Sequence, residues 1–227
     1  MSFKILVMSC DKNYDLWQPF YWCMEKYWSD HPEIIYSSET LVNPFYKTIN
    51  INYDIDKWTK RVYDTIKQIE CDNVLLMVDD LFIREKVDSK FINSLDNFVG
   101  GIVGGLNFEK SFDITDIQLN EHLCIRNPNG KFKTSVMCQL WSKKAMLDIF
   151  NCEKNPWTFE KDNNSGIYLF LISRNKPFIN WGYNERKWFG IRKGKWCKEI
   201  KTFFDNEGID IDYSVRGFNE WKSMCVL

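Results

Sequence analysis

The sequence predicts an α/β fold in which one mixed, mostly parallel sheet has helices on both faces of a single domain. Three observations favour this class. The chain has 227 residues, which suits one domain with a large core. Strand and helix patterns alternate through its first half, as a mostly parallel sheet requires. Aromatic residues make up 16% of the chain, whereas disordered chains contain few of them.

The first half contains strand patterns separated by amphipathic helix patterns. The clearest strand is NVLLMV at residues 73–78, a continuous apolar run that is typical of a buried parallel strand. The apolar run at residues 3–9 predicts another strand, which ends in the polar turn Ser9-Cys10-Asp11. Further strands are expected at residues 33–36 and 99–103, and helices at residues 15–29, 56–70 and 87–97. The glycine pairs at 100–101 and 104–105 indicate close backbone approach along a strand.

The second half is less regular. Strands are expected at residues 135–141, 177–181 and 188–192, and helices at residues 142–150, from 155 onward and at 198–206, with Gly208 ending the last helix. The apolar run at residues 167–173 fits either a strand or a helix. Because no linker separates the two halves, about residues 1–105 and 106–227, we expect them to share one sheet and to enclose a cleft.

Charge and cysteine content exclude several classes of function. The chain carries 30 Lys and Arg against 31 Asp and Glu, a net charge of −1, whereas proteins that bind nucleic-acid polymers are basic. Its 8 Cys and 2 His do not have zinc-finger spacing. We find no secretory signal and no apolar run of the roughly 20 residues that a membrane span needs. The sequence therefore predicts a cytoplasmic protein with reduced thiols, for which only peripheral membrane association remains open.

Asp79 and Asp80 are the first candidate site residues because they directly follow the clearest strand. In open α/β sheets, ligands bind beyond the carboxyl ends of the strands. Two adjacent carboxylates repel each other unless a cation or hydrogen bonds stabilise them. A carboxylate together with diphosphate oxygens commonly holds Mg²⁺ or Mn²⁺. The alternative is an ordinary polar turn after a strand.

Two further acidic residues lie at the ends of predicted elements. Asp11 would lie near Asp79 if their strands are adjacent, and could accept a hydrogen bond from a base or ribose; the alternative is a turn or helix-capping aspartate. Glu160, in the segment NPWTFE, stands beside Trp157 and Phe159 at the start of a helix. Partial desolvation would raise its pKa and make it a fair general base. The alternative is a first-turn glutamate that favours the helix dipole.

A basic segment, RKGKW, contains Arg192, Lys193 and Lys195 around one glycine. Three cations on a flexible loop suit phosphate groups, whereas the alternative is a solvated hairpin turn. Arg216 is a weaker basic site of the same kind. The signatures GxxxxGK[ST], GxGxxG and GxSxG are absent, so P-loop, Rossmann dinucleotide and α/β-hydrolase functions lack support.

Several segments occur in an order that resembles a known family. They are SCDKNYDLWQPFYWCMEKYW, VLLMVDDLF, SVMCQLWSKKAMLDIF, NPWTFE and RKGKW, followed by GIDID. The series covers roughly residues 3–217 and is similar to small bacterial and viral glycosyltransferases of the capsular-polysaccharide type. The resemblance implies a GT-A fold and transfer of a hexosyl or deoxyhexosyl group from a UDP- or GDP-sugar to a glycan acceptor. It makes residues 1–105 the nucleotide-binding half and residues 106–227 the acceptor-side half.

The resemblance also implies roles for the candidate residues. Asp79 and Asp80 would stand for the DxD motif and hold Mn²⁺ or Mg²⁺, although the segment lacks a strict DxD. Asp80 is the favoured metal ligand because it occupies the last position of the triplet Val-Asp-Asp. The late His that many GT-A enzymes add to the metal is missing. The nucleotide-binding residues would be Ser9, Cys10, Asp11, Asp79, Arg192, Lys193 and Lys195.

An inverting transfer needs a base on the far side of the sugar ring. Glu160 is predicted to be that base, with Asp162 and Asp113 in reserve. The tryptophans expected on the acceptor side, to stack on a sugar, are Trp157, Trp181 and Trp188, with Trp196 nearby. Core positions are expected for Trp17, Phe20, Trp28, Trp58 and Trp141. Two alternatives remain, a sugar nucleotidyltransferase, which releases pyrophosphate, and a nucleotide- or carbohydrate-binding module without turnover.

Overall fold

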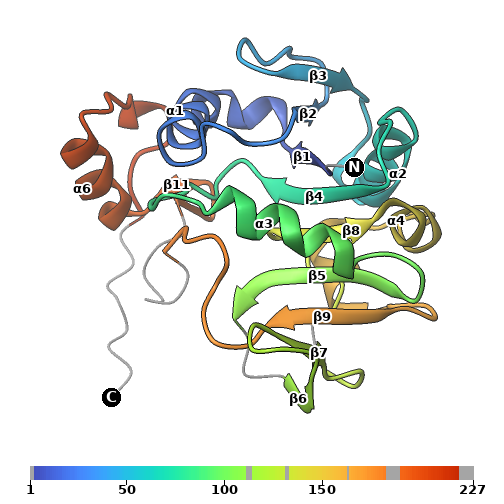
Figure 1. Cartoon of the computed structure of the whole chain (residues 1–227). Coiled ribbons are helices and arrows are strands. Elements are labelled where there is room, and N and C mark those ends of the chain that lie inside the picture. Colours follow the sequence, from blue (N-terminus) through green and yellow to red (C-terminus); the bar gives the residue numbers. More distant parts are fainter. Residues whose placement is uncertain (1–2, 111–113, 131–132, 163, 183–189, 220–227) are drawn as a thin grey trace.

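One nine-stranded sheet runs through the whole protein, as a computed structural model of the chain shows (Figure 1). The structure describes residues 3–110, 114–130, 133–162, 164–182 and 190–219. The strand order is β3-β2-β1-β4-β8-β5-β9-β7-β6. The strands are β1 (Lys4–Met8), β2 (Ile34–Ser38), β3 (Lys47–Asn50), β4 (Asn73–Val78), β5 (Val103–Lys110), β6 (Ile114–Gln118), β7 (Leu123–Arg126), β8 (Gln139–Ser142) and β9 (Leu169–Ser173).

The sheet is mixed, and most of its strands share one direction. The strands β3, β2, β1 and β4 are mutually parallel, and β5 and β9 form a second parallel pair. Strands β8 and β7 run antiparallel to their neighbours. A separate hairpin is formed by β10 (Ile191–Arg192) and β11 (Lys195–Trp196). Both halves of the chain therefore contribute to one sheet, as the sequence predicted.

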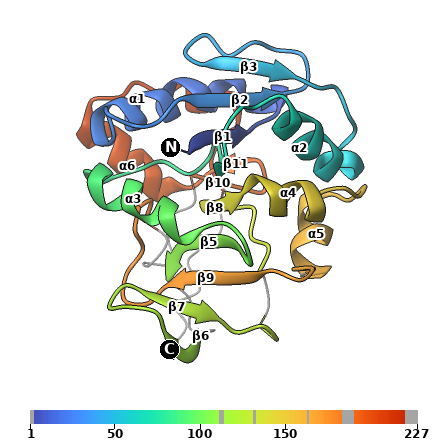
Figure 2. The same cartoon turned by 45° about the vertical axis from the view of Figure 1, so that its right-hand side comes forward.

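Helices cover both faces of this sheet (Figures 1 and 2). One face packs against α1 (Trp17–Tyr27), α3 (Ser89–Leu95) and α6 (Lys198–Glu207), and the other against α2 (Trp58–Lys67), α4 (Lys143–Ile149) and α5 (Pro156–Asp162). Short 3₁₀ turns are η1 (Asp11–Leu16), η2 (Ile55–Lys57), η3 (Asp96–Phe98) and η5 (Tyr213–Val215). Alternate residues of each strand enter opposite cores: Leu75 joins the first and Leu76 the second.

The local patterns predicted most of these elements. The strand at residues 73–78 has the predicted bounds, and the ambiguous run at 167–173 is strand β9. The helix expected at residues 15–29 begins earlier, as the 3₁₀ turn η1, and Pro19 lies in the first turn of α1, where it removes no helical hydrogen bond. Gly208 ends α6 with φ +71°, in the left-handed conformation expected of a C-terminal glycine. The five aromatic residues expected in the core are buried.

Two predicted strands are wrong. Residues 99–102 form a turn, because Gly100 and Gly101 adopt φ values of +138° and +58°, and the strand starts only at Val103. The close approach expected at both glycine pairs occurs only at the second: a Cβ on Gly104 would lie 2.6 Å from the Cβ of Tyr168, and one on Gly105 would lie 3.0 Å from the Leu140 carbonyl. At Gly100 and Gly101, by contrast, no atom of the described residues beyond their chain neighbours lies within 4 Å of such a Cβ. Residues 177–181 form no strand; they cross the end of β5, where the Phe178 amide donates to the Phe108 carbonyl over 2.9 Å.

Four strands were not predicted. The strands β3, β6, β7 and β11 are short and have at most five residues each. Two of them, KTIN and ITDIQ, lie at the edges of the sheet and lack a continuous apolar run. Because an edge strand faces only one neighbour, its sequence carries little of the periodic burial signal. No helix among the described residues is long and apolar enough to cross a membrane.

Candidate active site

The acid pair Asp79-Asp80 follows β4 at the edge where the parallel strands β1, β2 and β4 end. The register pairs Met8 with Val78, so the turn after β1 lies directly beside the acid pair. Residues far apart in sequence therefore meet at one edge, as the sequence predicted. This is the edge where open α/β sheets bind their ligands.

Asp79 is buried, and both of its carboxylate oxygens accept hydrogen bonds from this chain. The Ser9 hydroxyl donates to Oδ2, and the Asn13 amide donates to Oδ1 over 2.9 Å. The Trp17 indole donates to the Ser9 hydroxyl over 2.8 Å. Burial, together with the charge of Asp80, raises the pKa of Asp79 to about 7, against the effect of these hydrogen bonds.

Asp80 differs from its neighbour in being partly exposed and in having open oxygens. Desolvation raises its pKa to about 6, while its own backbone amide and the positive charge of Arg216 oppose that rise. No hydrogen bond from another described residue reaches its carboxylate. Of the two carboxylates, Asp80 is therefore the one available to a ligand or a cation.

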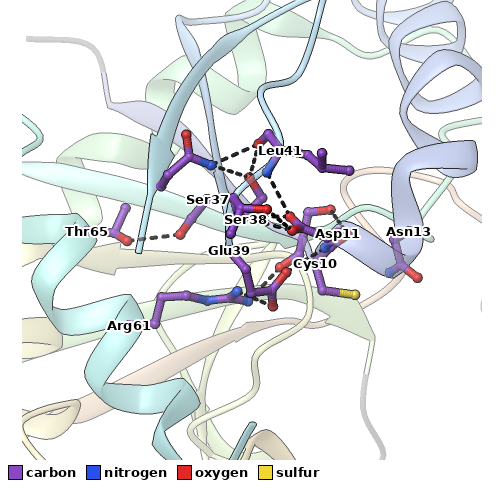
Figure 3. Close-up of polar contacts among 12 residues, drawn as sticks. Cys10, Asp11, Asn13, Ser37, Ser38, Glu39, Leu41, Arg61 and Thr65 are labelled. Atoms are coloured by element: carbon purple, nitrogen blue, oxygen red, sulfur yellow. Dashed lines mark hydrogen bonds and ion pairs between the residues drawn. The ribbon is translucent and has the colours of Figure 1, made fainter. Parts of the chain in front are cut away.

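The loop after β2 is tied to the turn after β1 by a network of charged groups (Figure 3). The Asp11 carboxylate accepts hydrogen bonds from the backbone amides of Thr40 and Leu41 at 3.1 and 3.0 Å. Although desolvation opposes them, these bonds and the Thr40 hydroxyl lower the pKa of Asp11. Arg61, only 3% exposed, donates to the Ser9 carbonyl and to Glu39, both over 2.6 Å.

The residues predicted to line the nucleoside pocket, Ser9, Cys10 and Asp11, all lie in or beside this network. Ser9 holds Asp79 and Asp11 holds the loop at residues 40–41. Cys10 is partly exposed between them, and desolvation raises the pKa of its thiol to about 11, so the thiol is neutral at pH 7. The three residues therefore shape the walls of this edge, and whether they contact a nucleoside stays a prediction.

The predicted basic segment forms the β10–β11 hairpin. Its two turn residues, Lys193 and Gly194, have φ values of +52° and +75°, as a type I′ turn requires. The base of the hairpin touches the segment that follows the acid pair, because a Cβ on Gly190 would lie 2.1 Å from the Phe82 ring and 3.1 Å from the Asp80 carbonyl. The segment is thus a hairpin turn, as the alternative interpretation expected, but the base of this hairpin lies next to Asp80.

Cys197 shows how close the hairpin is to the acid pair. Burial raises the pKa of its thiol, the charge of Asp80 raises it further, and the charge of Arg192 lowers it. Cys197 is also attached to the base of the hairpin, because its backbone amide donates to the Gly190 carbonyl over 3.0 Å. Arg192, Lys193 and Lys195 are exposed on this hairpin, so the structure brings the predicted cations to the side of the predicted carboxylates.

Glu160, the predicted base, is held at the start of β8. Its Oε1 atom accepts the Val136 amide over 2.9 Å and the Ser135 hydroxyl over 3.4 Å. Because Gln139 pairs with Leu76 of β4, the residues just before β8 lie beside the end of β4, at the edge that carries the acid pair. Burial raises the pKa of Glu160, and its hydrogen bonds and the charge of Arg126 oppose this rise.

Sequence reasoning missed another acid in the same region, Glu109, whose side chain is partly buried. Glu109 lies near the end of β5, and burial raises its pKa to about 7; the charge of Arg126 lowers it and that of Glu160 raises it. Its Oε1 atom is buried without a hydrogen-bond partner among the described residues. Glu109 follows an apolar run as Asp79 does, but the strand was predicted to end at residue 103. Arg126, the last residue of β7, is buried, and its positive charge lowers the pKa of both Glu109 and Glu160.

The tryptophans divide differently from the expectation. Trp157, on α5, is 64% exposed and remains a candidate for stacking on a sugar. Trp181 is 2% exposed and Trp196 fully buried, with its ring against Phe82, so neither presents a face to a ligand. The prediction that they face the acceptor is therefore wrong in this structure, because both rings belong to the hydrophobic core on the face of the sheet that α1, α3 and α6 cover. Trp188 and the reserve base Asp113 lie outside the described residues.

Known proteins provide a structural match and no sequence match. No family model and no curated protein matches the sequence. TarS of S. aureus, residues 1–349 in complex with UDP, has a TM-score of 0.55 at 10% identity over 78% of this chain and 59% of that one. A longer TarS structure has a TM-score of 0.53 at 11% identity over 79% of this chain and 36% of that one. The chain thus spans less than two thirds of either TarS structure.

A cytidylyltransferase from Leptospira borgpetersenii covers 98% of this chain and 100% of its own, at 8% identity and a TM-score of 0.49. Likeness at such identities concerns the fold and not the activity. Taken with the strand order and the site at the carboxyl edge, the TarS match shows that the protein has the GT-A fold. The expected fold class is therefore confirmed.

The residues at the acid pair provide one ligand for a cation rather than a complete cage. No group of three or more His, Cys, Asp or Glu side chains suited to a metal occurs in the part of the chain that the structure describes. Asp80 offers a carboxylate with open oxygens, and hard divalent cations such as Mg²⁺ need only one or two protein carboxylates when a substrate diphosphate supplies further oxygens. The residues therefore fit a cation that binds together with a diphosphate.

Proposed function

We propose that the protein is a cation-dependent glycosyltransferase that moves a hexosyl or deoxyhexosyl group from a nucleoside-diphosphate sugar to a hydroxyl group of a glycan, as in polysaccharide biosynthesis. The observation that carries the proposal is the partly exposed Asp80 carboxylate, between the basic hairpin and the residues that hold Glu160, at the carboxyl edge of a GT-A sheet. The TarS structures hold UDP and UDP-GlcNAc, which makes UDP-sugars the first donors to test.

Each group would have a separate task in an inverting transfer. Glu160 would take the proton from the acceptor hydroxyl, whose oxygen then forms the new bond to the anomeric carbon from the face opposite the diphosphate. The bond between that carbon and the diphosphate oxygen breaks, and its electron pair stays on the diphosphate. Arg192, Lys193 and Lys195 would stabilise the departing charge, which is an electrostatic effect of several kcal/mol.

Mn²⁺ or Mg²⁺, when bound by Asp80, would supply a Lewis acid that stabilises the same developing charge. Asp79 would contribute indirectly, because its oxygens accept hydrogen bonds from Ser9 and Asn13 and thereby fix the end of β4. Trp157, which is exposed on the helix that carries Glu160, would contact the acceptor sugar.

Turnover of UDP-sugars with Mn²⁺ tests the proposal. We expect Glu160→Gln to bind UDP normally and to lose about 10²–10⁴-fold in turnover, the usual contribution of a general base. Asp80→Ala should lose cation-dependent UDP binding. Glu153→Gln is the matched control. Glu153 lies just before α5, the helix that carries Glu160, and its side chain forms an exposed ion pair with Lys57.

Three outcomes would contradict the proposal. Wild-type turnover in both Asp80→Ala and Glu160→Gln would remove the site assignment. Release of pyrophosphate rather than UDP would indicate a nucleotidyltransferase. Binding of UDP-sugars with no product from any acceptor would indicate a binding module.

A further inference from the structure

Arg216, near the C-terminal end of the described chain, is fixed by four hydrogen bonds to the turn after β1. Its Nε and Nη2 atoms donate to the two oxygens of Asp15, at 2.7 and 2.6 Å. Nη2 also donates to the Lys12 carbonyl over 2.6 Å and to the Asn13 Oδ1 atom over 2.9 Å. The side chains of Arg216 and Asp15 are both 9% exposed, so the pair is largely removed from solvent and weakly screened by salt.

Asn13 connects this ion pair to the acid pair. Its Oδ1 accepts from Arg216, and its Nδ2 donates to Asp79 Oδ1 over 2.9 Å. An arginine can only donate hydrogen bonds. Arg216 therefore requires the Asn13 Oδ1 atom on its own side, which turns the NH₂ group of Asn13 toward Asp79.

The same C-terminal segment is attached to the basic hairpin. The Trp196 amide donates to the Gly217 carbonyl over 3.0 Å, and the Asn219 amide donates to the Trp196 carbonyl over 2.9 Å. Phe218 forms a bridge to Trp196 of β11. Residues 217–219 thus extend the hairpin by pairing with β11. The preceding residue, Arg216, contacts the turn after β1, which lies beside the acid pair.

We propose that Arg216 is a positioning residue, which orients Asp79 through Asn13 and fixes the basic hairpin relative to the acid pair. The Nε and Nη2 donors of Arg216 are used by the turn after β1, which fixes the side chain against that turn. With Asp79 held in this way, Asp80 is left to the cation and the diphosphate. This inference rests on the proposed function in one respect only, namely that the acid pair binds a cation and a diphosphate.

The connection itself can be tested without any ligand. The Asn13 side-chain amide signals in a ¹⁵N-correlated NMR spectrum should shift in Arg216→Ala and also in Asp79→Asn. They should stay in place in Lys26→Ala, which breaks a different ion pair between α1 and α6, that of Lys26 with Glu207. Unchanged Asn13 signals in Arg216→Ala would overturn the inference even if the protein bound no nucleotide.

Calorimetric titration with UDP and Mn²⁺ tests the consequence. We expect Arg216→Ala and Asn13→Ala each to bind UDP about tenfold more weakly, which corresponds to about 1.4 kcal/mol, and the double variant to lose no more than either single variant. Arg216→Lys should fall between wild type and Arg216→Ala, because an ammonium group keeps the charge but not the planar fork. Lys26→Ala should bind as wild type does.

The outcomes separate this inference from the proposed function. Wild-type affinity in Arg216→Ala, or losses that add in the double variant, would show that Arg216 does not act through Asn13. A wild-type protein that binds neither UDP nor GDP would contradict the proposed function, and the Asn13 signals would then decide the positioning role alone.

Discussion

Three carboxyl groups, those of Asp79, Asp80 and Glu109, have pKa values of about 7, 6 and 7. Desolvation is the largest cause in each case, and neighbouring charges modify it. Clusters of acids with strongly raised pKa values are typical of functional sites. Burial of an ionised carboxylate also lowers the free energy of unfolding. This cost should be larger for Glu109, whose Oε1 atom has no hydrogen-bond partner among the described residues, than for Asp79, whose oxygens accept two hydrogen bonds.

Glu109→Gln should make stability less dependent on pH. The folded-state pKa of Glu109 is about 7, against about 4.3 in an unfolded chain. Between these values only the folded state holds the proton, so the free energy of unfolding falls as pH rises through this window and stays lower above it. Glutamine cannot ionise, so we expect Glu109→Gln to be up to about 3–4 kcal/mol more stable than wild type at pH 8, at about 1.4 kcal/mol for each unit of pKa difference, and nearly equal to it at pH 4.

Urea unfolding at pH 4 and pH 8 measures this effect. The control is Glu121→Gln, whose side chain is 85% exposed and should change stability equally little at both pH values. A stability difference for Glu109→Gln that is the same at pH 4 and pH 8 would show that Glu109 does not carry a proton in the folded protein.

At the scale of elements, the basic hairpin combines a strained turn with a cluster of charge. Lys193 adopts φ +52°, a conformation that costs a lysine more than a glycine or an asparagine. A solvated turn in a merely structural hairpin would gain from asparagine at this position. The charge of Lys193 can therefore be tested separately from the conformation of the turn.

Lys193→Asn separates the two roles. Asparagine tolerates the left-handed conformation, so the melting temperature should not fall. If Lys193 meets the diphosphate, UDP binding should weaken by about two- to fivefold, the size expected of one exposed charge pair, and should depend less on salt. Lys47→Asn, an equal loss of charge on the outer strand β3, should leave UDP affinity unchanged. Equal affinities in Lys193→Asn and wild type would remove Lys193 from the site.

At the scale of the whole molecule, the GT-A sheet brings the segments after β1, β2 and β4 and the segment before β8 to one edge. A donor that binds there contacts the folded state alone, since the edge exists only when β1, β2, β4 and β8 are paired. Ligand binding should therefore raise the stability of the entire domain by mass action.

A thermal-shift titration measures that coupling. At 100 times its dissociation constant, a UDP-sugar with Mn²⁺ should add about 2.7 kcal/mol, or about 5–10 °C in melting temperature for a chain of this size. The shift should disappear in Asp80→Ala and shrink when Mn²⁺ is replaced by a chelator. If no UDP- or GDP-sugar shifts the wild-type protein with either cation, the donor assignment is wrong.

The parts of this protein that follow from sequence are those governed by neighbouring residues. The acid pair was found because Asp79 and Asp80 terminate an unbroken apolar strand, whose bounds depend on six consecutive residues. Glu109 was missed because the strand was expected at residues 99–103. Gly100 and Gly101 instead form a turn, so β5 begins at Val103 and continues past Glu109. Trp157 and Trp181 were both predicted to face the acceptor, and only the packing of the core, which includes Trp181 and leaves Trp157 64% exposed, separates them.

The sequence by itself therefore determined the alternation of strands and helices, the α/β class of fold, and the position of two carboxylates at the end of the central strand, since each depends on local periodicity; the GT-A fold was implied only by the resemblance to a known family. The tertiary structure alone decided which carboxylate keeps open oxygens and where the cations stand. Those outcomes depend on contacts such as Asn13 with Asp79, 66 residues apart, and Arg216 with Asp15, 201 residues apart. No local pattern records contacts of that range, because only the folded sheet brings such residues to one edge.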